Sequence, residues 1–316
     1  MQKNIIHIED ADDGMKLKKW IRKAFPAVPL SALHRHLRKK NVKWNGKRAN
    51  GEEVLATGDA IECFFGEEIQ TPKQNSLETV KVFSGPKFSV LLEDDFVLVI
   101  NKPAGVAVQP GSDIPKGSSV VERLSAEYAE QVIRPVHRLD KDTSGALVFA
   151  KRGKALRTLH ESLRNGEWKK EYRAVVAGIL PKKTGTIDAS ILRERDGSRQ
   201  DSEGKNAITH YRVEQTGSLL LSDETNIDVS ELRLQIDTGR MHQIRIHLSG
   251  MKNPVLGDKK YGDFPLNRLL QKEIGLRRQF LHAEHLSFPH PELSETIFIV
   301  APLPEDLVNV FKSFSF

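Results

Sequence analysis

The sequence has a single cysteine, Cys63, among 316 residues. One thiol excludes a disulfide framework and a zinc site built on paired cysteines, and it is typical of proteins in a reducing cytosol. No apolar run approaches the roughly 18–20 residues of a membrane span, and the first residues, MQKNIIHIEDADDG, lack the layout of a signal peptide. We therefore expect a cytoplasmic protein without a membrane partner.

Several motifs of common enzymes are also missing. The sequence has no GxSxG nucleophile elbow around Ser144, no GxxxxGK[ST] phosphate loop and no GxGxxG dinucleotide pattern. The pairs His242 with His247 and His282 with His285 lack an HExxH pattern and a clear third ligand, which favours structural roles. Hydrolase, nucleoside triphosphatase and dinucleotide-dependent functions therefore lose support.

Acidic residues are absent from residues 15–48, where twelve of the chain's 48 Lys and Arg residues lie. A local positive field of this kind attracts a polyanion, which favours nucleic acid as the partner over a merely solvated basic surface. The residues that we expect to form an RNA-binding patch are Arg35, Arg38, Lys39, Lys40, Lys43, Lys47 and Arg48.

The basic segment belongs to a compact unit expected over residues 1–65. Apolar residues at helical spacing predict a helix over 14–25 and a second one with Leu30, Leu33 and Leu37 on its inner face. Asn45-Gly46 is a strong hairpin signal, and a strand should follow within 58–65. Two helices and a small sheet would present the basic side chains to a phosphate backbone.

A polar stretch broken by Pro and Gly, residues 66–86, is expected to link this unit to a larger one over 87–316. Apolar runs in the larger unit predict strands within 88–102, 146–151, 171–180, 208–215, 218–222 and 231–236. Helical spacing predicts helices over 118–130 and 154–166. This order indicates an α+β fold with a mixed, mostly antiparallel central sheet and flanking helices.

The segment TGRMHQIRIHLSG, residues 238–250, fits two structures. As a helix it would be capped by Thr238 and would turn Ile244 and Leu248 inward. As a strand it would alternate apolar and polar residues from Gln243 to Leu248. In both cases its many polar side chains exceed what a simple core element needs, although a hydrogen-bonded surface element remains an equal alternative.

The densest polar cluster is HRLDKDTSG, residues 137–145, directly before the apolar run ALVFA. An aspartate near an arginine is a committed anion at neutral pH, suited to nucleophilic attack or cation stabilisation rather than general acid work. Asp142 begins Asp-Thr-Ser-Gly, which is ordinary turn chemistry. Asp140 is therefore the better candidate for a reactive carboxylate, while a structural role for it stays open.

These residues resemble a known family, the RluA-type RNA pseudouridine synthases. HRLDKDTSG is similar to the family's signature around its catalytic aspartate, and four further motifs match in order: NKPAG (101–105), KKEYRAVVAG (169–178), GRMHQIRIHL (239–248) and FLHAEHLSF (280–288). Residues 15–65 resemble the ribosomal-protein-S-four-like RNA-binding domain that commonly precedes this catalytic domain. Details near GDKKYGDFPLNR and LRTLHESLRNGEWKKEY are most similar to the C-type subfamily, which acts on large-subunit ribosomal RNA.

The resemblance implies a role for each matching residue. Asp140 would form a transient bond to the target nucleotide, and Arg245 would pair with its carboxylate. Tyr172 would pack on the uracil, Arg138 would help to replace the flipped uridine, and Ile244 would line the pocket. The family needs no metal or organic cofactor, and we expect a monomer that acts on ribosomal RNA or its assembling particle.

Two alternatives remain beside this hypothesis. A non-catalytic RNA-binding protein of ribosome assembly could use the same scaffold, and for it the basic unit alone would suffice. A carboxylate-dependent glycosidase would need a second essential acid near Asp140, because glycoside hydrolysis normally uses two carboxylates.

Overall fold

The computed structural model describes residues 2–9, 12–25, 30–65, 87–128, 133–194 and 197–316. The expected linker over 66–86 lies outside these residues, so the division into domains at this point stays a prediction. None of the described helices is long and apolar enough to cross a membrane.

Residues 2–65 contain a four-stranded antiparallel sheet and two helices. The sheet runs in the order β1 (Gln2–His7), β4 (Ala60–Phe65), β2 (Val42–Trp44), β3 (Lys47–Arg48), and the helices are α1 (Leu17–Ala24) and α2 (Leu30–Arg38). Asn45 and Gly46 both have positive φ, 48° and 76°, as the predicted two-residue hairpin requires. The strand β1 was not foreseen from the sequence.

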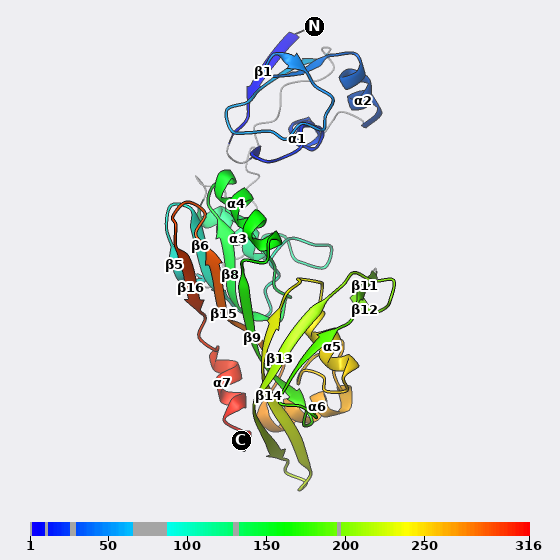
Figure 1. Cartoon of the computed structure of the whole chain (residues 1–316), viewed down its shortest axis with the longest axis vertical. Coiled ribbons are helices and arrows are strands. Elements are labelled where there is room, and N and C mark those ends of the chain that lie inside the picture. Colours follow the sequence, from blue (N-terminus) through cyan, green and yellow to red (C-terminus); the bar gives the residue numbers. More distant parts are fainter. Residues whose placement is uncertain (1, 10–11, 26–29, 66–86, 129–132, 195–196) are drawn as a thin grey trace.

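This part of the chain has its own hydrophobic core. Leu17, Ile21 and Leu33 are at most 1% exposed and pack with Phe25 and Leu37, which confirms the predicted helical faces at these positions. The side chain of Leu30 lies outside the described ones. Figure 1 places this unit at one end of the molecule, next to α4. There the carboxylate of Asp13 pairs with Arg157 of α4, which joins the two parts of the chain.

The larger part is built on one sheet of ten strands, almost all antiparallel. Its main path is β10 (Thr184–Asp188), β13 (Ile208–Leu220), β14 (Asn226–Ile236), β9 (Lys169–Ala177), β15 (Leu281–Pro289), β8 (Ser144–Ala150), β6 (Val97–Lys102), β5 (Ser89–Glu93), while β16 (Thr296–Val300) pairs with β15 and β7 (Arg134–Pro135) with β8. Only β8 and β15 pair in parallel among these strands. A separate hairpin comprises β11 (Ile191–Glu194) and β12 (Gly197–Gln200).

Five helices flank this sheet (Figure 1). They are α3 (Val120–Glu127), α4 (Gly153–Arg164), α5 (Gln243–Gly250), α6 (Phe264–Ile274) and α7 (Glu305–Phe311). The predicted α+β class with a mostly antiparallel sheet is confirmed.

Strand β8, at the centre of the sheet, is covered on both of its faces. All seven of its residues are buried. Leu147 and Phe149 pack in one hydrophobic cluster, and Val148 in another, as the alternation of a strand requires. Leu124 of α3 lies in the first cluster and Leu159 of α4 in the second. Burying a side chain such as Phe149 contributes about 1.5–3 kcal/mol to the stability of the fold. The packing on both faces therefore holds β8, the strand that follows the polar cluster, firmly in place.

The structure resolves the segment 238–250 as the helix α5, which ends at Gly250. Its Ile244 and Leu248 join the main core, as the helical interpretation predicted. The predicted cap is wrong, because His242 occupies the N-cap position with left-handed backbone. Thr238 instead donates its hydroxyl to the Gln243 side chain at 2.7 Å, and this glutamine also accepts the N–H of Arg240.

Candidate active site

The residues of HRLDKDT form an irregular connection between β7 and β8. Asp140 retains 21% of its side-chain exposure, and its carbonyl accepts the N–H of Thr143 at 3.2 Å in a tight turn. Ser144 and Gly145 were expected in this turn, but they belong to β8. The reactive carboxylate proposed from the sequence therefore stands at the entrance of a fully buried strand.

The side chain of Lys102 holds this connection in place by hydrogen bonds to backbone carbonyls. Its side chain is fully buried at the end of β6, and its Nζ donates to the carbonyls of Pro103, Val106 and Lys141 at 2.8 to 2.9 Å. Burial lowers the pKa of Lys102 to about 7, against the opposing charges of nearby aspartates. Three acceptors match the three hydrogens of an ammonium group, so the lysine ties the Asp140 turn to the NKPAG segment.

Arg245 of α5 joins the Asp140 turn to a second buried carboxylate. Its Nη1 donates to Oδ2 of Asp140 at 3.0 Å, while Nε and Nη2 bind Asp258 in a bidentate pair at 2.7 and 2.8 Å. Burial alone would lower the pKa of Arg245, but its bonds to both carboxylates raise it overall. The arginine therefore stays charged and holds the Asp140 side chain in place.

Asp258 itself is almost completely buried, with 1% of its side chain exposed. Burial would raise its pKa, yet the bonds from Arg245 and from the N–H groups of Lys260 and Tyr261 lower it overall. Sequence reasoning missed Asp258, although it stands in the quoted GDKKYG run. An acidic residue directly after a glycine in a polar run gives no local sign that it will be buried.

A cavity of about 460 Å³ opens beside Asp140. Tyr172 of β9 and Ile244 of α5 line it, with 7% and 5% exposure. Burial raises the pKa of Tyr172, and the charge of Asp140 acts in the same direction, so the phenol is protonated at neutral pH. The cavity thus offers an aromatic face and an aliphatic wall next to a carboxylate, which suits a flat heterocycle.

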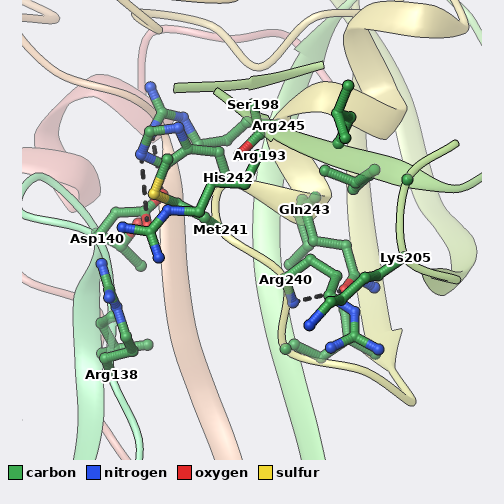
Figure 2. A pocket seen from close by; sticks show the side chains of 18 of the residues that line it. Arg138, Asp140, Arg193, Ser198, Lys205, Arg240, Met241, His242, Gln243 and Arg245 are labelled. Carbon is green, nitrogen blue, oxygen red and sulfur yellow. Dashed lines mark hydrogen bonds and ion pairs between the residues drawn. The ribbon is translucent and has the colours of Figure 1, made fainter. Parts of the chain in front are cut away.

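Basic side chains surround the mouth of this cavity. Arg138 is exposed beside Asp140, and Lys205 and Arg240 lie across from it, as Figure 2 shows. Arg193 also lines the cavity. Arg193 comes from the β11–β12 hairpin, which sequence reasoning missed because the run RERDGSRQDSEGK is polar throughout. This rim is complementary to the phosphates of a nucleic acid strand.

His137 has a structural role. Its Nε2 accepts the N–H of Val148 at 3.2 Å, and its ring meets Trp168 edge-on. Burial lowers the pKa of His137 to about 3, so it is neutral. This histidine completes the hydrogen bonding of β8 and does no chemistry on a ligand in the cavity.

The other histidines singled out in the sequence differ from one another. His247 bonds Thr209, and His282 bonds Ser144 and the carbonyl of Ala301, in agreement with structural roles. His242, in contrast, lines the cavity with its Nε2 3.9 Å from Oδ1 of Asp140. The described residues contain no group of three or more His, Cys, Asp or Glu side chains suited to a metal ion.

The predicted RNA-binding patch lies on α2 and the β2–β3 hairpin of the N-terminal unit. Lys43 is half-buried with its Nζ 5.5 Å from the centre of the Phe64 ring. The six other residues of the patch are exposed, namely Arg35, Arg38, Lys39, Lys40, Lys47 and Arg48. These cations are thus accessible to solvent, and none of them lines the cavity beside Asp140. That they act together as one RNA-binding patch stays a prediction.

Comparison with known proteins agrees with the geometry. A family model described as RNA pseudouridylate synthase matches residues 96–250. The chain is 35% identical to ribosomal large subunit pseudouridine synthase C of Escherichia coli (strain K12), over 96% of this chain and 94% of that protein. The protein of the same name from Haemophilus influenzae is 33% identical, over 98% of this chain and 94% of the relative.

Solved structures give the same result for the fold. Human RNA pseudouridylate synthase domain containing 1 has a TM-score of 0.58 at 25% identity and covers 72% of this chain and 88% of its own. Human RNA pseudouridylate synthase domain containing 4 has a TM-score of 0.56 at 27% identity, with coverage of 72% and 94%.

Proposed function

The chain belongs to the RluA-type family of RNA pseudouridine synthases, and from this premise we propose that it isomerises specific uridines of large-subunit ribosomal RNA, with Asp140 as the reactive carboxylate. The names of the relatives support this substrate. The observation that carries the assignment of Asp140 is its ion pair with Arg245 at the wall of the cavity.

The reaction explains why one carboxylate suffices. Isomerisation detaches uracil from the ribose, turns it and rejoins it through carbon 5, so no water is consumed. A glycosidase would need a second carboxylate about 5–9.5 Å away to act as an acid or to deliver water. Asp258 does not fit that role, because Arg245 and two backbone N–H groups already occupy its oxygens. These contacts favour the isomerase over the glycosidase alternative.

A uridine inside folded RNA must leave its stack to reach Asp140, which costs a few kcal/mol. We assign Tyr172 to packing against the extruded uracil and Ile244 to the opposite contact, since both line the cavity. Arg138 is exposed at the rim, where its guanidinium can occupy the gap left in the RNA. Stacking on an aromatic ring offsets about 1–3 kcal/mol of the cost of extrusion.

The basic N-terminal unit would supply affinity, and the cavity would select the base. Accordingly, we assign residues 1–65 to RNA binding and residues 87–316 to catalysis. The bacterial relatives named for the ribosomal large subunit support an action on ribosomal RNA or on an assembling particle. We further propose that the enzyme is cytoplasmic and monomeric.

The patch predicts a measurable salt dependence. Replacing Arg35, Arg38, Lys39 and Lys40 by glutamine should weaken binding to a ribosomal RNA fragment. It should also reduce the slope of log binding constant against log salt by about three, since each phosphate contact contributes roughly 0.7–0.9. Filter binding at several salt concentrations measures this slope.

A matched control removes the same number of charges from exposed positions outside the patch. We choose glutamine at Lys182, Lys183, Lys272 and Lys312. This variant should retain most of the slope. Equal slopes for the two variants would show that overall charge, rather than the surface of α2, determines binding.

The proposed substrate is tested by mapping pseudouridines in ribosomal RNA from cells with and without the gene. We expect defined positions of the large-subunit RNA to lose the modification and to regain it when the gene is restored. An unchanged map together with defective ribosome assembly would favour the alternative function, a non-catalytic RNA-binding assembly factor.

A further inference from the structure

His242 is held in a strained conformation next to Asp140. Its backbone is left-handed, with φ 59° and ψ 22°, at the N-cap of α5. For a residue other than glycine this region is unfavourable, and such strain persists only where the surroundings impose it. Gln243 supplies part of that restraint, because its side chain accepts from Thr238 and from the N–H of Arg240.

The ring of His242 is fixed as firmly as its backbone. Its Nδ1 lies 2.8 Å from the hydroxyl of Tyr261, and the two rings meet edge to face with centres 5.4 Å apart. The same hydroxyl oxygen accepts the N–H of Ser198 at 3.2 Å. Nδ1 is the one acceptor for this hydroxyl among the described residues, so we assign the Tyr261 hydrogen to Nδ1. With this assignment, the ring hydrogen of a neutral His242 is on Nε2.

Nε2 points to the one oxygen of Asp140 that is not bound by Arg245. Arg245 occupies Oδ2, whereas Nε2 of His242 is 3.9 Å from Oδ1 (Figure 2). This distance is too long for a direct hydrogen bond. A third atom that enters from the cavity can therefore lie within contact distance of both groups.

The surroundings favour the uncharged form of this donor. Burial lowers the pKa of His242; the charge of Asp140 opposes this effect, and Arg245 and Lys260 reinforce it. A neutral ring does not form an ion pair with Asp140. Oδ1 is thus left free to react, while Nε2–H stays available to a ligand.

We propose that His242 is a catalytic residue that donates Nε2–H to a carbonyl oxygen of the target uracil, beside Oδ1 of Asp140. The inference rests on the proposed function. Isomerisation breaks the bond between N1 of uracil and C1′ of the ribose, and the electron pair stays on the base. Its negative charge spreads to the carbonyl oxygens, where a fixed N–H donor stabilises it.

The remaining steps balance without any added reagent. C5 of the turned base forms a bond with C1′, C5 loses its proton, and N1 gains one. Product and substrate are therefore isomers, and His242 keeps its own proton throughout. Its contribution is confined to stabilising charge on the detached base.

Phenylalanine at position 242 tests the proposal, because it keeps a ring against Tyr261 but removes the donor. Removing one such donor typically costs about 100–1,000-fold in kcat. We expect His242→Phe to lower kcat on uridine RNA by about 100-fold with little change in KM. His242→Gln keeps an N–H donor and should recover part of the lost kcat. An unchanged kcat in His242→Phe would overturn the proposal.

A second substrate separates this role from a structural one. Uracil that carries fluorine at C5 is a better leaving group and needs less stabilisation. In RNA with 5-fluorouridine at the target, the defect of His242→Phe in cleavage of the N1–C1′ bond should be at least about tenfold smaller than with uridine. Equal defects on both substrates would show that the variant merely disturbs the site.

Two further variants complete the test. If His242→Phe fails to fold, Tyr261→Phe removes the hydroxyl that orients Nδ1 and should give a weaker loss with the same dependence on the substrate. His210, which is half-buried, bonded to Thr186 and Asp237 and absent from the lining of the cavity, provides a control. His210→Gln should keep full activity on both substrates. If Asp140→Asn is inactive but the His242 variants keep full activity, the role of His242 is refuted and the proposed function stays intact.

Discussion

Replacing Asp140 by asparagine should abolish pseudouridine formation while the protein stays folded and binds RNA. Asparagine has the same shape, but it lacks the negative charge that pairs with Arg245 at 3.0 Å and that the proposed reaction requires. We expect kcat to fall by roughly a thousand-fold or more, as is usual when the reacting group is removed. The melting temperature should change little, because Arg245 keeps its bidentate pair with Asp258.

The matched control is Asp142→Asn, two positions further along the same connection. Asp142 is half-buried and is not among the residues that line the cavity. This variant should keep most of the activity. Tritium release from RNA labelled at C5 of uridine measures both rates. Modification that survives in Asp140→Asn would remove the catalytic assignment and leave RNA binding as the function.

Alanine at Gly145 should destabilise the protein strongly. Gly145 has φ 121° in β8 and faces Ala283 of the parallel strand β15. A Cβ at this position would lie 2.2 Å from the Ala283 oxygen and 2.6 Å from its nitrogen. Because both strands belong to the core of the sheet, neither backbone can yield. We expect a loss of about 4 kcal/mol or more in the free energy of unfolding, and insoluble protein in many preparations.

Gly166→Ala separates the close approach from backbone strain. Gly166 also has positive φ, 77°, but nothing lies within 4 Å of the place where its Cβ would stand. This variant should cost only about 1–2 kcal/mol. Urea unfolding of both variants gives the comparison. Similar losses would show that positive φ, rather than contact with β15, makes glycine necessary at position 145.

The strongly periodic elements could be predicted from the sequence. The buried strand over 146–151 and the helix over 154–166 have patterns that only one structure satisfies, and both are present within a few residues. The turn residues Asn45 and Gly46 also have one favourable conformation. Local chemistry is sufficient in these cases, because near neighbours in the chain decide the outcome.

Other features depended on distant contacts. The segment 238–250 fits a helix and a strand equally well by pattern, and only packing of Ile244 and Leu248 into the core decides for the helix. The cap expected at Thr238 was wrong, because Gln243 uses that hydroxyl in its own network. Lys102 looked like an ordinary basic residue, yet it is the buried support of the Asp140 turn.

By itself, the sequence determined the class of fold, the family and the candidate residues, because motifs and periodicities are properties of short segments. The tertiary structure decided which groups meet. Asp140 is 105 residues from Arg245 in the chain, and Arg245 is 13 residues from Asp258; the three pair only because the sheet and α5 bring them together. His242 lines the cavity beside Asp140, whereas His137 bonds the backbone of β8. The surroundings of a side chain, rather than its type, set its charge, its partner and its access to the cavity.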